Sequence, residues 1–220
     1  MKFTKDKIRA SMLLYAVTDE MWLKEGQTLA SVTEEVLKNG ATFLQIREKE
    51  LGDADFLNQA KALKEVAARY GVPYVVNDNI QVALECDADG VHVGQSDIVG
   101  KDVRSMIGPD KILGISANTV ETAIAAEKAG ADYIGVGAVF NTSTKKDATT
   151  LSVSQLREIC DAVRIPVVAI GGISSGNILQ LSGSGIDGVA VVSAIYAQSD
   201  PGAATAELLE KAWKMVASHG

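Results

Sequence analysis

One stretch of the chain combines strand-like alternation with basic and amide side chains. Residues 43–49 read Phe-Leu-Gln-Ile-Arg-Glu-Lys, so period-two alternation puts Gln45, Arg47 and Lys49 on one face. If this face lines the interior of the protein, its Arg and Lys lose hydration and need a partner, which an anionic ligand supplies. The stretch therefore predicts an anion site. The alternative is an internal salt-bridge cluster with acidic residues from neighbouring strands.

Two carboxylates follow the next two apolar runs. Asp78 ends the segment Val-Val-Asn-Asp at 75–78, and Asp97 ends Gly-Gln-Ser-Asp at 94–97. Adjacent parallel strands end at the same rim, and hard oxygen ligands suit Mg²⁺, which usually takes one or two protein carboxylates. The pair predicts a Mg²⁺ site opposite the basic stretch. For a single Asp the commoner role is a helix N-cap, and Asp97 has this alternative role on the helix that follows.

Segments after the sixth, seventh and eighth apolar runs also suit anions. Residues 141–147 carry Thr142, Ser143, Thr144 and Lys145, which offer hydroxyl donors and positive charge to a phosphate; a solvated loop is the alternative. Gly171-Gly172-Ile173 and the segment 190–195 predict a cup of backbone N–H groups, although the glycines also suit a plain turn. Two anion sites at one rim indicate an enzyme with two phosphorylated small-molecule substrates.

These segments follow a regular alternation of apolar runs and amphipathic stretches. Eight runs have the length of strands: 13–18, 43–47, 74–77, 90–94, 112–116, 133–137, 167–171 and 189–193. Amphipathic stretches between and after them include 29–38, 56–70, 120–129, 153–163 and 204–216. Eight strand–helix units predict a single (β/α)₈ TIM barrel, an α/β fold, with an extra helix at 3–10 covering its bottom. An open doubly wound sheet is the alternative.

Composition limits the class of protein. The chain has 220 residues, a formal net charge of −7 and no dense basic run, which predicts one domain over 1–220 and no nucleic-acid or membrane partner. The two cysteines, Cys86 and Cys160, lie far apart and fit buried free thiols of a reducing cytoplasm. The early apolar run ends too soon, at Asp19, for a signal peptide. We expect a cytoplasmic location.

Several familiar catalytic patterns are missing from the sequence. It has no P-loop motif, no His/Cys metal cluster and no recognisable Ser-His-Asp arrangement. His92 lies within the fourth run, where a packed barrel histidine is the plain interpretation. Ser116 ends the fifth run, at a place from which it could donate a hydrogen bond to a ligand.

Taken together, the motifs resemble those of the thiamine phosphate synthase family over nearly the whole chain. They are Tyr15-Ala16-Val17-Thr18-Asp19, Gln45-Ile46-Arg47-Glu48-Lys49, Asn77-Asp78, the segment from Gly90 to Asp97, the segment from Thr142 to Ala148, Ala169-Ile170-Gly171-Gly172-Ile173 and Val192-Ser193-Ala194-Ile195. The Gln-x-Arg-Glu-Lys and Thr-x-Thr-Lys-Lys-Asp motifs are the specific parts. The glycine motifs occur in many phosphate-binding barrels.

The resemblance implies a transferase that joins hydroxymethylpyrimidine diphosphate to a thiazole phosphate, with or without a carboxylate, and releases pyrophosphate. It implies that the pyrimidine diphosphate is held by Gln45, Ile46, Arg47, Glu48, Lys49, Asn77, Ser116 and Lys145. It also assigns Mg²⁺ to Asp78 and Asp97, and the thiazole phosphate to Thr142, Ser143, Thr144, Gly172, Val192 and Ser193. Arg47, Lys49 and Lys145 would neutralise the departing diphosphate in a dissociative substitution. A homo-oligomer is a further family-level expectation.

The chain departs from the family pattern at three positions. Asn79 stands where the family commonly has Arg, and Ala138 and Asn141 replace prolines around the sixth-strand loop. The first change removes one possible diphosphate contact, and the others leave the loop less preorganised. Two other functions are the alternatives: a thiazole tautomerase, which needs neither the basic strand nor the Asp pair, and a noncatalytic phosphate-binding barrel, which needs only the glycine cup.

Overall fold

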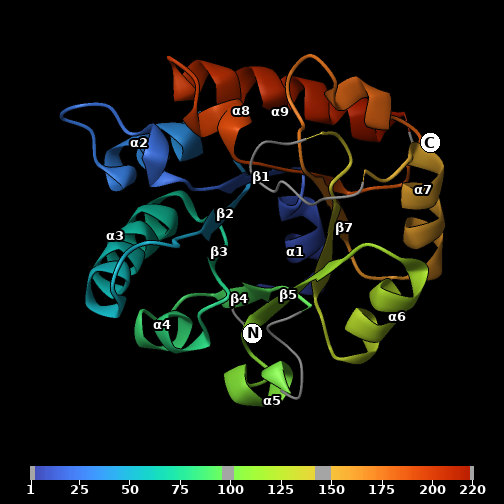
Figure 1. Ribbon diagram of the computed structural model, residues 1–220, viewed down its shortest axis with the longest axis horizontal. Coiled ribbons are helices and arrows are strands. Elements are labelled where there is room, and N and C mark those ends of the chain that lie inside the picture. Colours follow the sequence, from blue (N-terminus) through green and yellow to red (C-terminus); the bar gives the residue numbers. More distant parts are fainter. Residues whose placement is uncertain (1–2, 96–101, 142–149, 219–220) are drawn as a thin grey trace.

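The computed structural model describes residues 3–95, 102–141 and 150–218. Eight parallel strands close into a barrel in which each strand pairs with the next and the last pairs with the first (Figure 1). The strands are β1 (Leu14–Val17), β2 (Phe43–Ile46), β3 (Tyr74–Asn77), β4 (Gly90–Val93), β5 (Ile112–Ala117), β6 (Tyr133–Gly137), β7 (Val167–Ile170) and β8 (Gly188–Val191). The closed ring confirms the TIM-barrel prediction and excludes the open doubly wound sheet.

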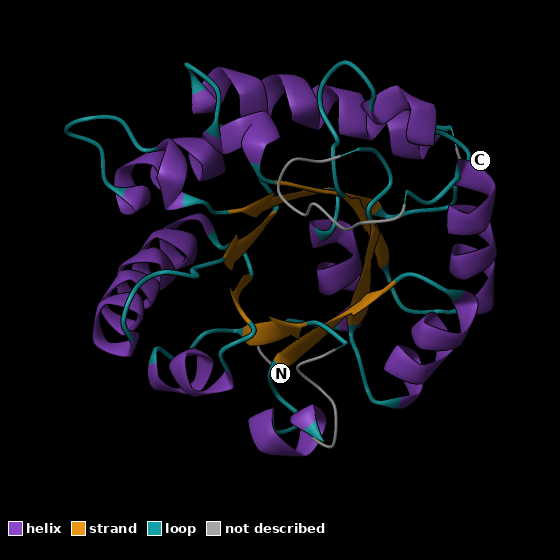
Figure 2. Ribbon diagram, viewed as in Figure 1, coloured by secondary structure: helices purple, strands orange, loops and turns teal. Residues whose placement is uncertain are grey.

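Helices surround the ring of strands, except α1, which lies across the middle of the ring in this view (Figures 1 and 2). They are α1 (Lys5–Ser11), α2 (Leu29–Lys38), α3 (Asp53–Tyr70), α4 (Ile80–Glu85), α5 (Val103–Ile107), α6 (Val120–Lys128), α7 (Val153–Ala162), α8 (Ser193–Tyr196) and α9 (Pro201–Ala217), with short 3₁₀ helices η1 (Glu20–Trp22) and η2 (Ile178–Leu181). The predicted helical stretches all correspond to helices, and their bounds differ by a few residues at most. None of the described helices is long and apolar enough to cross a membrane.

Strand alternation sorts the apolar side chains into two layers. Leu44 and Ile46 belong to the large cluster between the strands and the outer helices, whereas Phe43 belongs to a smaller cluster inside the barrel. Phe3, Ile8 and Met12, from and around α1, join this inner cluster. The predicted extra helix therefore closes the bottom of the barrel, and the polar residues of β2 are left for the opposite end.

Local signals explain where the helices begin and end. Hydroxyl side chains at Thr28, Thr119 and Ser152 form capping boxes at the starts of α2, α6 and α7. The residue that ends α3 is Gly71, whose φ of 63° lies in the left-handed region that glycine adopts without a steric cost.

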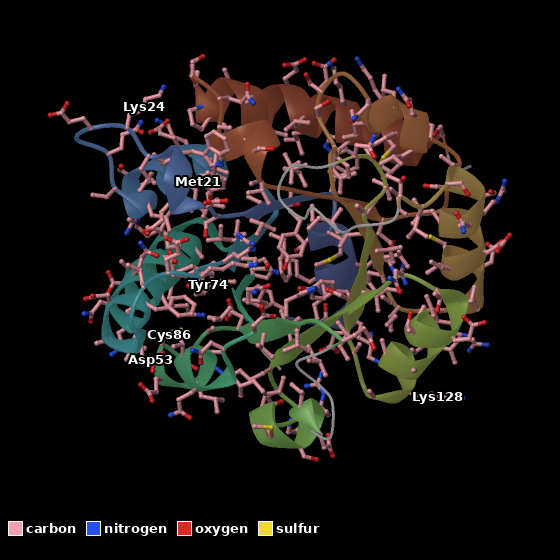
Figure 3. All side chains as sticks on the ribbon, in the orientation of Figure 1. Met21, Lys24, Asp53, Tyr74, Cys86 and Lys128 are labelled. Atoms are coloured by element: carbon pink, nitrogen blue, oxygen red, sulfur yellow. The ribbon has the colours of Figure 1, made fainter. Side chains whose placement is uncertain are left out.

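Both cysteines are free thiols, as predicted. Cys86, labelled in Figure 3, is buried at the end of α4, and Cys160 is half-buried in α7. Burial raises the pKa of both thiols, to about 12 for Cys160. Neither thiol therefore has the depressed pKa that a nucleophilic cysteine needs.

Candidate active site

The carboxyl-terminal ends of β1 to β5 bring several of the predicted side chains together. Gln45 on β2 is buried next to β1, with its amide Nε2 donating to the Tyr15 hydroxyl at 2.6 Å. Asn77 on β3 pairs in register with His92 on β4. Because these residues alternate with those of the outer apolar layer, they lie on the inner face of the strands. The predicted inward orientation of Gln45 is confirmed.

Arg47 lies just past the end of β2, where its backbone N–H donates to the buried Thr18 hydroxyl at 3.1 Å. Its guanidinium is 3.9 Å from the carboxylate of Asp19, and the Arg47 side chain is only 17% exposed. An acidic partner from the neighbouring strand end, which was the alternative interpretation, is thus present. Among the described residues it is the only ion-pair partner of Arg47, and one long contact does not use the five N–H donors of a guanidinium. A ligand anion has donors available to it.

Lys49 differs from the prediction. β2 ends at Ile46, and the Glu48 carboxylate accepts the backbone N–H groups of both Lys49 and Glu50, at 2.6 Å and 2.8 Å. This turn stops the period-two alternation, so Lys49 does not continue the inward face and its side chain is exposed. Ile46 packs in the outer apolar layer, which leaves only its backbone for contact with a ligand.

Asp78 occupies a special backbone position directly after β3. Its φ is 60°, in the left-handed region that only Asp, Asn and Gly visit with any ease. Its backbone N–H donates to the His92 carbonyl at 2.8 Å, and its side chain accepts from the Asn77 amide. The exposed carboxylate at this rim has the donor chemistry that Mg²⁺ prefers, so the residue present fits the ion.

The structure shows which residues cap the two helices that follow β3 and β4. The cap of α5 is Asp102, whose side chain accepts from Ser105 N. Asn79, where the family commonly has Arg, caps α4 by accepting from Val82 N at 2.9 Å. No cluster of three or more metal-ligating side chains occurs within 3–95, 102–141 and 150–218.

The loop after β7 has the backbone geometry of a tight cup. Gly171 and Gly172 have φ values of 103° and 65°, and a Cβ at Gly172 would lie 2.3 Å from the Asn141 carbonyl oxygen. Asn177 holds this loop, since its amide donates to the Gly172 carbonyl at 2.9 Å and its carbonyl accepts from Ser174 N at 2.8 Å. The sequence interpretation missed Asn177, for which a Ser-x-x-Asn spacing was the only available signal.

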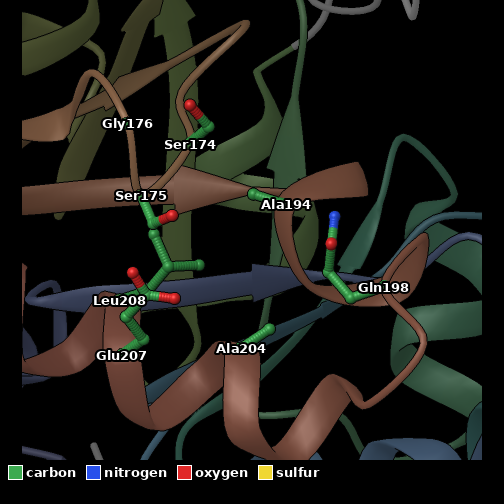
Figure 4. Close-up of a pocket in the computed structure, with 8 residues that line it drawn as sticks. All are labelled: Ser174, Ser175, Gly176, Ala194, Gln198, Ala204, Glu207 and Leu208. Carbon is green, nitrogen blue, oxygen red and sulfur yellow. The ribbon is translucent and has the colours of Figure 1, made fainter.

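The second half of the cup follows β8. Val192 leads into α8, and Ser193 at the start of this helix is exposed. A cavity of about 190 Å³ lies beside it, between the β7 loop, α8 and α9 (Figure 4). The residues that line the cavity are Ser174, Ser175, Gly176, Ala194, Gln198, Ala204, Glu207 and Leu208.

A polar network that the sequence interpretation also missed crosses the barrel interior. The Tyr15 hydroxyl is 2.8 Å from that of Tyr133, and Tyr133 is 3.0 Å from His92 Nδ1. His92 Nε2 is in turn 3.0 Å from the Ser116 hydroxyl. His92 is therefore packed in the barrel, as the plain interpretation had it, but it also contacts a predicted ligand-binding residue. Burial raises the pKa of both tyrosines.

Five predicted site residues lie outside the described residues. They are Asp97, Thr142, Ser143, Thr144 and Lys145. Their assignments stay predictions.

The fold and the rim together define an enzyme of the TIM-barrel class, in which active sites lie at the carboxyl ends of the strands. A family model described as thiamine monophosphate synthase matches residues 14–195. The chain is 49% identical over 204 residues to a thiamine-phosphate synthase of Ruminiclostridium cellulolyticum, covering 93% of this chain and 97% of the relative. It is 47% identical over 195 residues to that of Clostridium tetani, covering 89% and 93%.

A solved structure agrees with these relatives. Thiamine phosphate pyrophosphorylase from Pyrococcus furiosus superposes with a TM-score of 0.86 at 37% identity, covering 95% of this chain and 99% of that one. The chain belongs to the thiamine monophosphate synthase family. Its function is thiamine-phosphate synthesis, a transferase reaction.

Proposed function

We propose that the chain condenses 4-amino-2-methyl-5-hydroxymethylpyrimidine diphosphate with thiazole phosphate, or its carboxylate, and releases thiamine phosphate and pyrophosphate. The observation that carries the proposal is the arrangement of the rim. Gln45 and Arg47 lie at the end of β2 and just beyond it, Asp78 follows β3, and a separate glycine cup follows β7. The rim thus offers one anion site beside the Asp78 carboxylate and a second anion site in the glycine cup.

In this proposal the pyrimidine lies over β2 to β5. Gln45, Asn77 and Ser116 hold its ring and methylene group, with the backbone of Ile46 and Glu48 beside them. Arg47 is half-buried and is paired by only one long contact among the described residues, so its guanidinium donates to the diphosphate. The family resemblance implies that Lys49 and Lys145 add positive charge near the diphosphate.

Asp78 and Asp97 would hold Mg²⁺, which supplies positive charge to the diphosphate as it leaves. The αL backbone at Asp78 is fixed by its N–H bond to the His92 carbonyl, so the carboxylate is presented at the rim in one place. Strain of this kind is typical of sites where a side chain must be held in position.

The thiazole phosphate occupies the cup. Gly172, Val192 and Ser193 offer backbone N–H groups and a hydroxyl to the phosphate, and Thr142, Ser143 and Thr144 join them by the resemblance. Asn177 keeps the Gly172 peptide in place through its two hydrogen bonds.

The chemistry is a substitution at the pyrimidine methylene carbon. The carbon–oxygen bond to diphosphate breaks, the electron-rich aminopyrimidine stabilises the resulting cation, and the thiazole nitrogen forms the new carbon–nitrogen bond. No protein nucleophile is needed, and both cysteines have raised pKa values. The protein contributes positioning and electrostatic stabilisation. We place the reaction in the cytoplasm, in keeping with two free thiols.

The direct test is to mix the purified protein with both substrates and follow thiamine phosphate and pyrophosphate, with Mg²⁺ and with Mg²⁺ chelated. We expect both products in equal amounts, and only with Mg²⁺. Isomerisation of the thiazole phosphate without pyrophosphate would instead support the tautomerase. Absence of any product from fresh substrates would reject the synthase mechanism.

A further inference from the structure

A continuous chain of hydrogen bonds joins two sides of the proposed pyrimidine site. It runs from Gln45 on β2 through Tyr15, Tyr133 and His92 to Ser116 on β5. The two end residues are ones that the family resemblance assigns to the pyrimidine, and the three residues between them have no assigned part in the reaction. The barrel interior therefore links two ligand-binding groups that are 71 residues apart in the sequence.

Two glycines make room for this chain. A Cβ at Gly114 would lie 2.2 Å from the ring of Tyr133 and 2.5 Å from His92 Nδ1, and a Cβ at Gly135 would lie 3.2 Å from His92 Cε1. Any other residue at 114 would displace one of the rings. The strand sequences therefore leave space for this chain of hydrogen bonds, which is not a chance contact of mobile side chains.

The directions of the hydrogen bonds follow from one end. The Gln45 amide nitrogen donates to the Tyr15 oxygen, so the Tyr15 proton goes to its other partner, Tyr133. The proton of Tyr133 then goes to His92 Nδ1.

A neutral imidazole that accepts at Nδ1 carries its proton on Nε2. His92 therefore donates to the Ser116 oxygen, and the Ser116 proton points elsewhere. Within the described part of the chain, nothing donates to the carbonyl oxygen of Gln45. Burial raises the pKa of Tyr15 and Tyr133, so both phenols keep the protons on which this order depends.

We propose that His92 is a positioning residue whose Nε2–H fixes Ser116 as a hydrogen-bond donor to the ligand. At its other end, the same chain of hydrogen bonds leaves the Gln45 carbonyl oxygen as an acceptor for the ligand. One donor and one acceptor match an aminopyrimidine, whose exocyclic amino group donates and whose ring nitrogens accept. This chain of hydrogen bonds thereby favours a ligand with an exocyclic amino group over one with an oxygen at the same ring position. The identity of the ligand rests on the proposed function, whereas the proton order does not.

The proton order is tested on the ligand-free protein. The sequence contains two histidines, His92 and His219, so ¹⁵N-histidine labelling gives two imidazoles to assign, and His219→Gln identifies which signal is His92. Near neutral pH we expect the His92 signals to show the proton on Nε2. A proton on Nδ1, or a doubly protonated ring, would overturn the proposal whether or not the protein makes thiamine phosphate.

A matched pair of variants tests whether the order matters for binding. Tyr133→Phe removes the donor to His92 Nδ1, and Tyr74→Phe removes an equally buried hydroxyl that bonds to the Ala60 carbonyl at 3.1 Å, outside the barrel interior (Figure 3). We expect Tyr133→Phe to give a mixed His92 tautomer and a KM for the pyrimidine diphosphate raised about 5- to 10-fold, with a smaller change in kcat. Tyr74→Phe should change neither. Equal behaviour of the two variants would reject the positioning role.

Substitution of His92 itself gives a second test that does not depend on Tyr133→Phe folding. His92→Gln places an amide N–H near the position of Nε2 and should hold the KM within about 2-fold, whereas His92→Asn is too short and should raise it about 5- to 10-fold. With the pyrimidine analogue that carries oxygen in place of the amino group, wild-type discrimination should weaken in His92→Asn. The same KM and the same discrimination in both variants would contradict the proposal.

Discussion

The glycine cup after β7 offers the most direct test of how backbone shape determines binding. Gly172 has a φ of 65°, where a residue with a Cβ costs about 1–2 kcal/mol. Its Cβ would also lie 2.3 Å from the Asn141 carbonyl oxygen and 2.9 Å from the Phe140 carbonyl carbon, both backbone atoms that cannot rotate away. Relieving such an overlap costs about 1–3 kcal/mol or moves the loop. Gly172→Ala should therefore destabilise the protein by about 2–5 kcal/mol or displace the cup.

The matched control is Gly71→Ala at the end of α3. Its φ of 63° imposes the same conformational cost, but no atom lies within 4 Å of the new Cβ. We expect Gly71→Ala to lose about 1–2 kcal/mol in urea unfolding and to keep its KM for thiazole phosphate. Gly172→Ala should raise that KM at least about tenfold, which corresponds to about 1.4 kcal/mol of lost binding. A folded Gly172→Ala protein with the wild-type KM would refute the reasoning that the cup requires this backbone path.

Three further predictions follow from the rim and the barrel interior. Asp78→Asn keeps a residue that tolerates the left-handed backbone, so it should stay folded and lose Mg²⁺-dependent turnover; full activity in a Mg²⁺ titration would remove Asp78 from the metal site. Arg47→Lys should raise the KM for the pyrimidine diphosphate about tenfold or more, because a point charge replaces a fork of donors, and an unchanged KM would place the diphosphate elsewhere. Burial raises the pKa values of Tyr15 and Tyr133 above 10.0, so the unfolded protein loses these protons at a lower pH than the folded protein does. The free energy of unfolding should therefore fall as pH rises beyond about 10. Urea unfolding across that range should show a shallower fall for Tyr133→Phe than for the wild type.

The fold could be predicted because each strand carries its own signal. β3 and β6 have the predicted bounds, and the other strands differ by one or two residues at an end, since the last apolar residue of a run does not show where pairing stops. Lys49 illustrates the limit. Alternation alone put Lys49 on the same face as Gln45 and Arg47, whereas the Glu48 carboxylate accepts two backbone N–H groups and ends the regular conformation.

The candidate site was predictable where the residue type and its place at a strand end together indicate a function. Gln45 and Asp78 lie at the rim, because strand ends bring such residues together in a barrel. Tyr15 and Tyr133 gave no such signal, since a tyrosine in an apolar strand is indistinguishable from core until its hydroxyl partner is known. Asn177 was missed because its two partners are backbone groups, which the sequence does not identify.

Helix α1 gives the barrel a direction. With Phe3, Ile8 and Met12 filling its lower end, substrates have to arrive, and products depart, on the side of the strand ends. Because there is one entrance, the order in which substrates bind and products leave matters. A molecule bound against Gln45 cannot leave while another molecule is bound between it and the entrance. Kinetic patterns of product inhibition would then record which substrate occupies the floor of the barrel and which lies nearer the entrance.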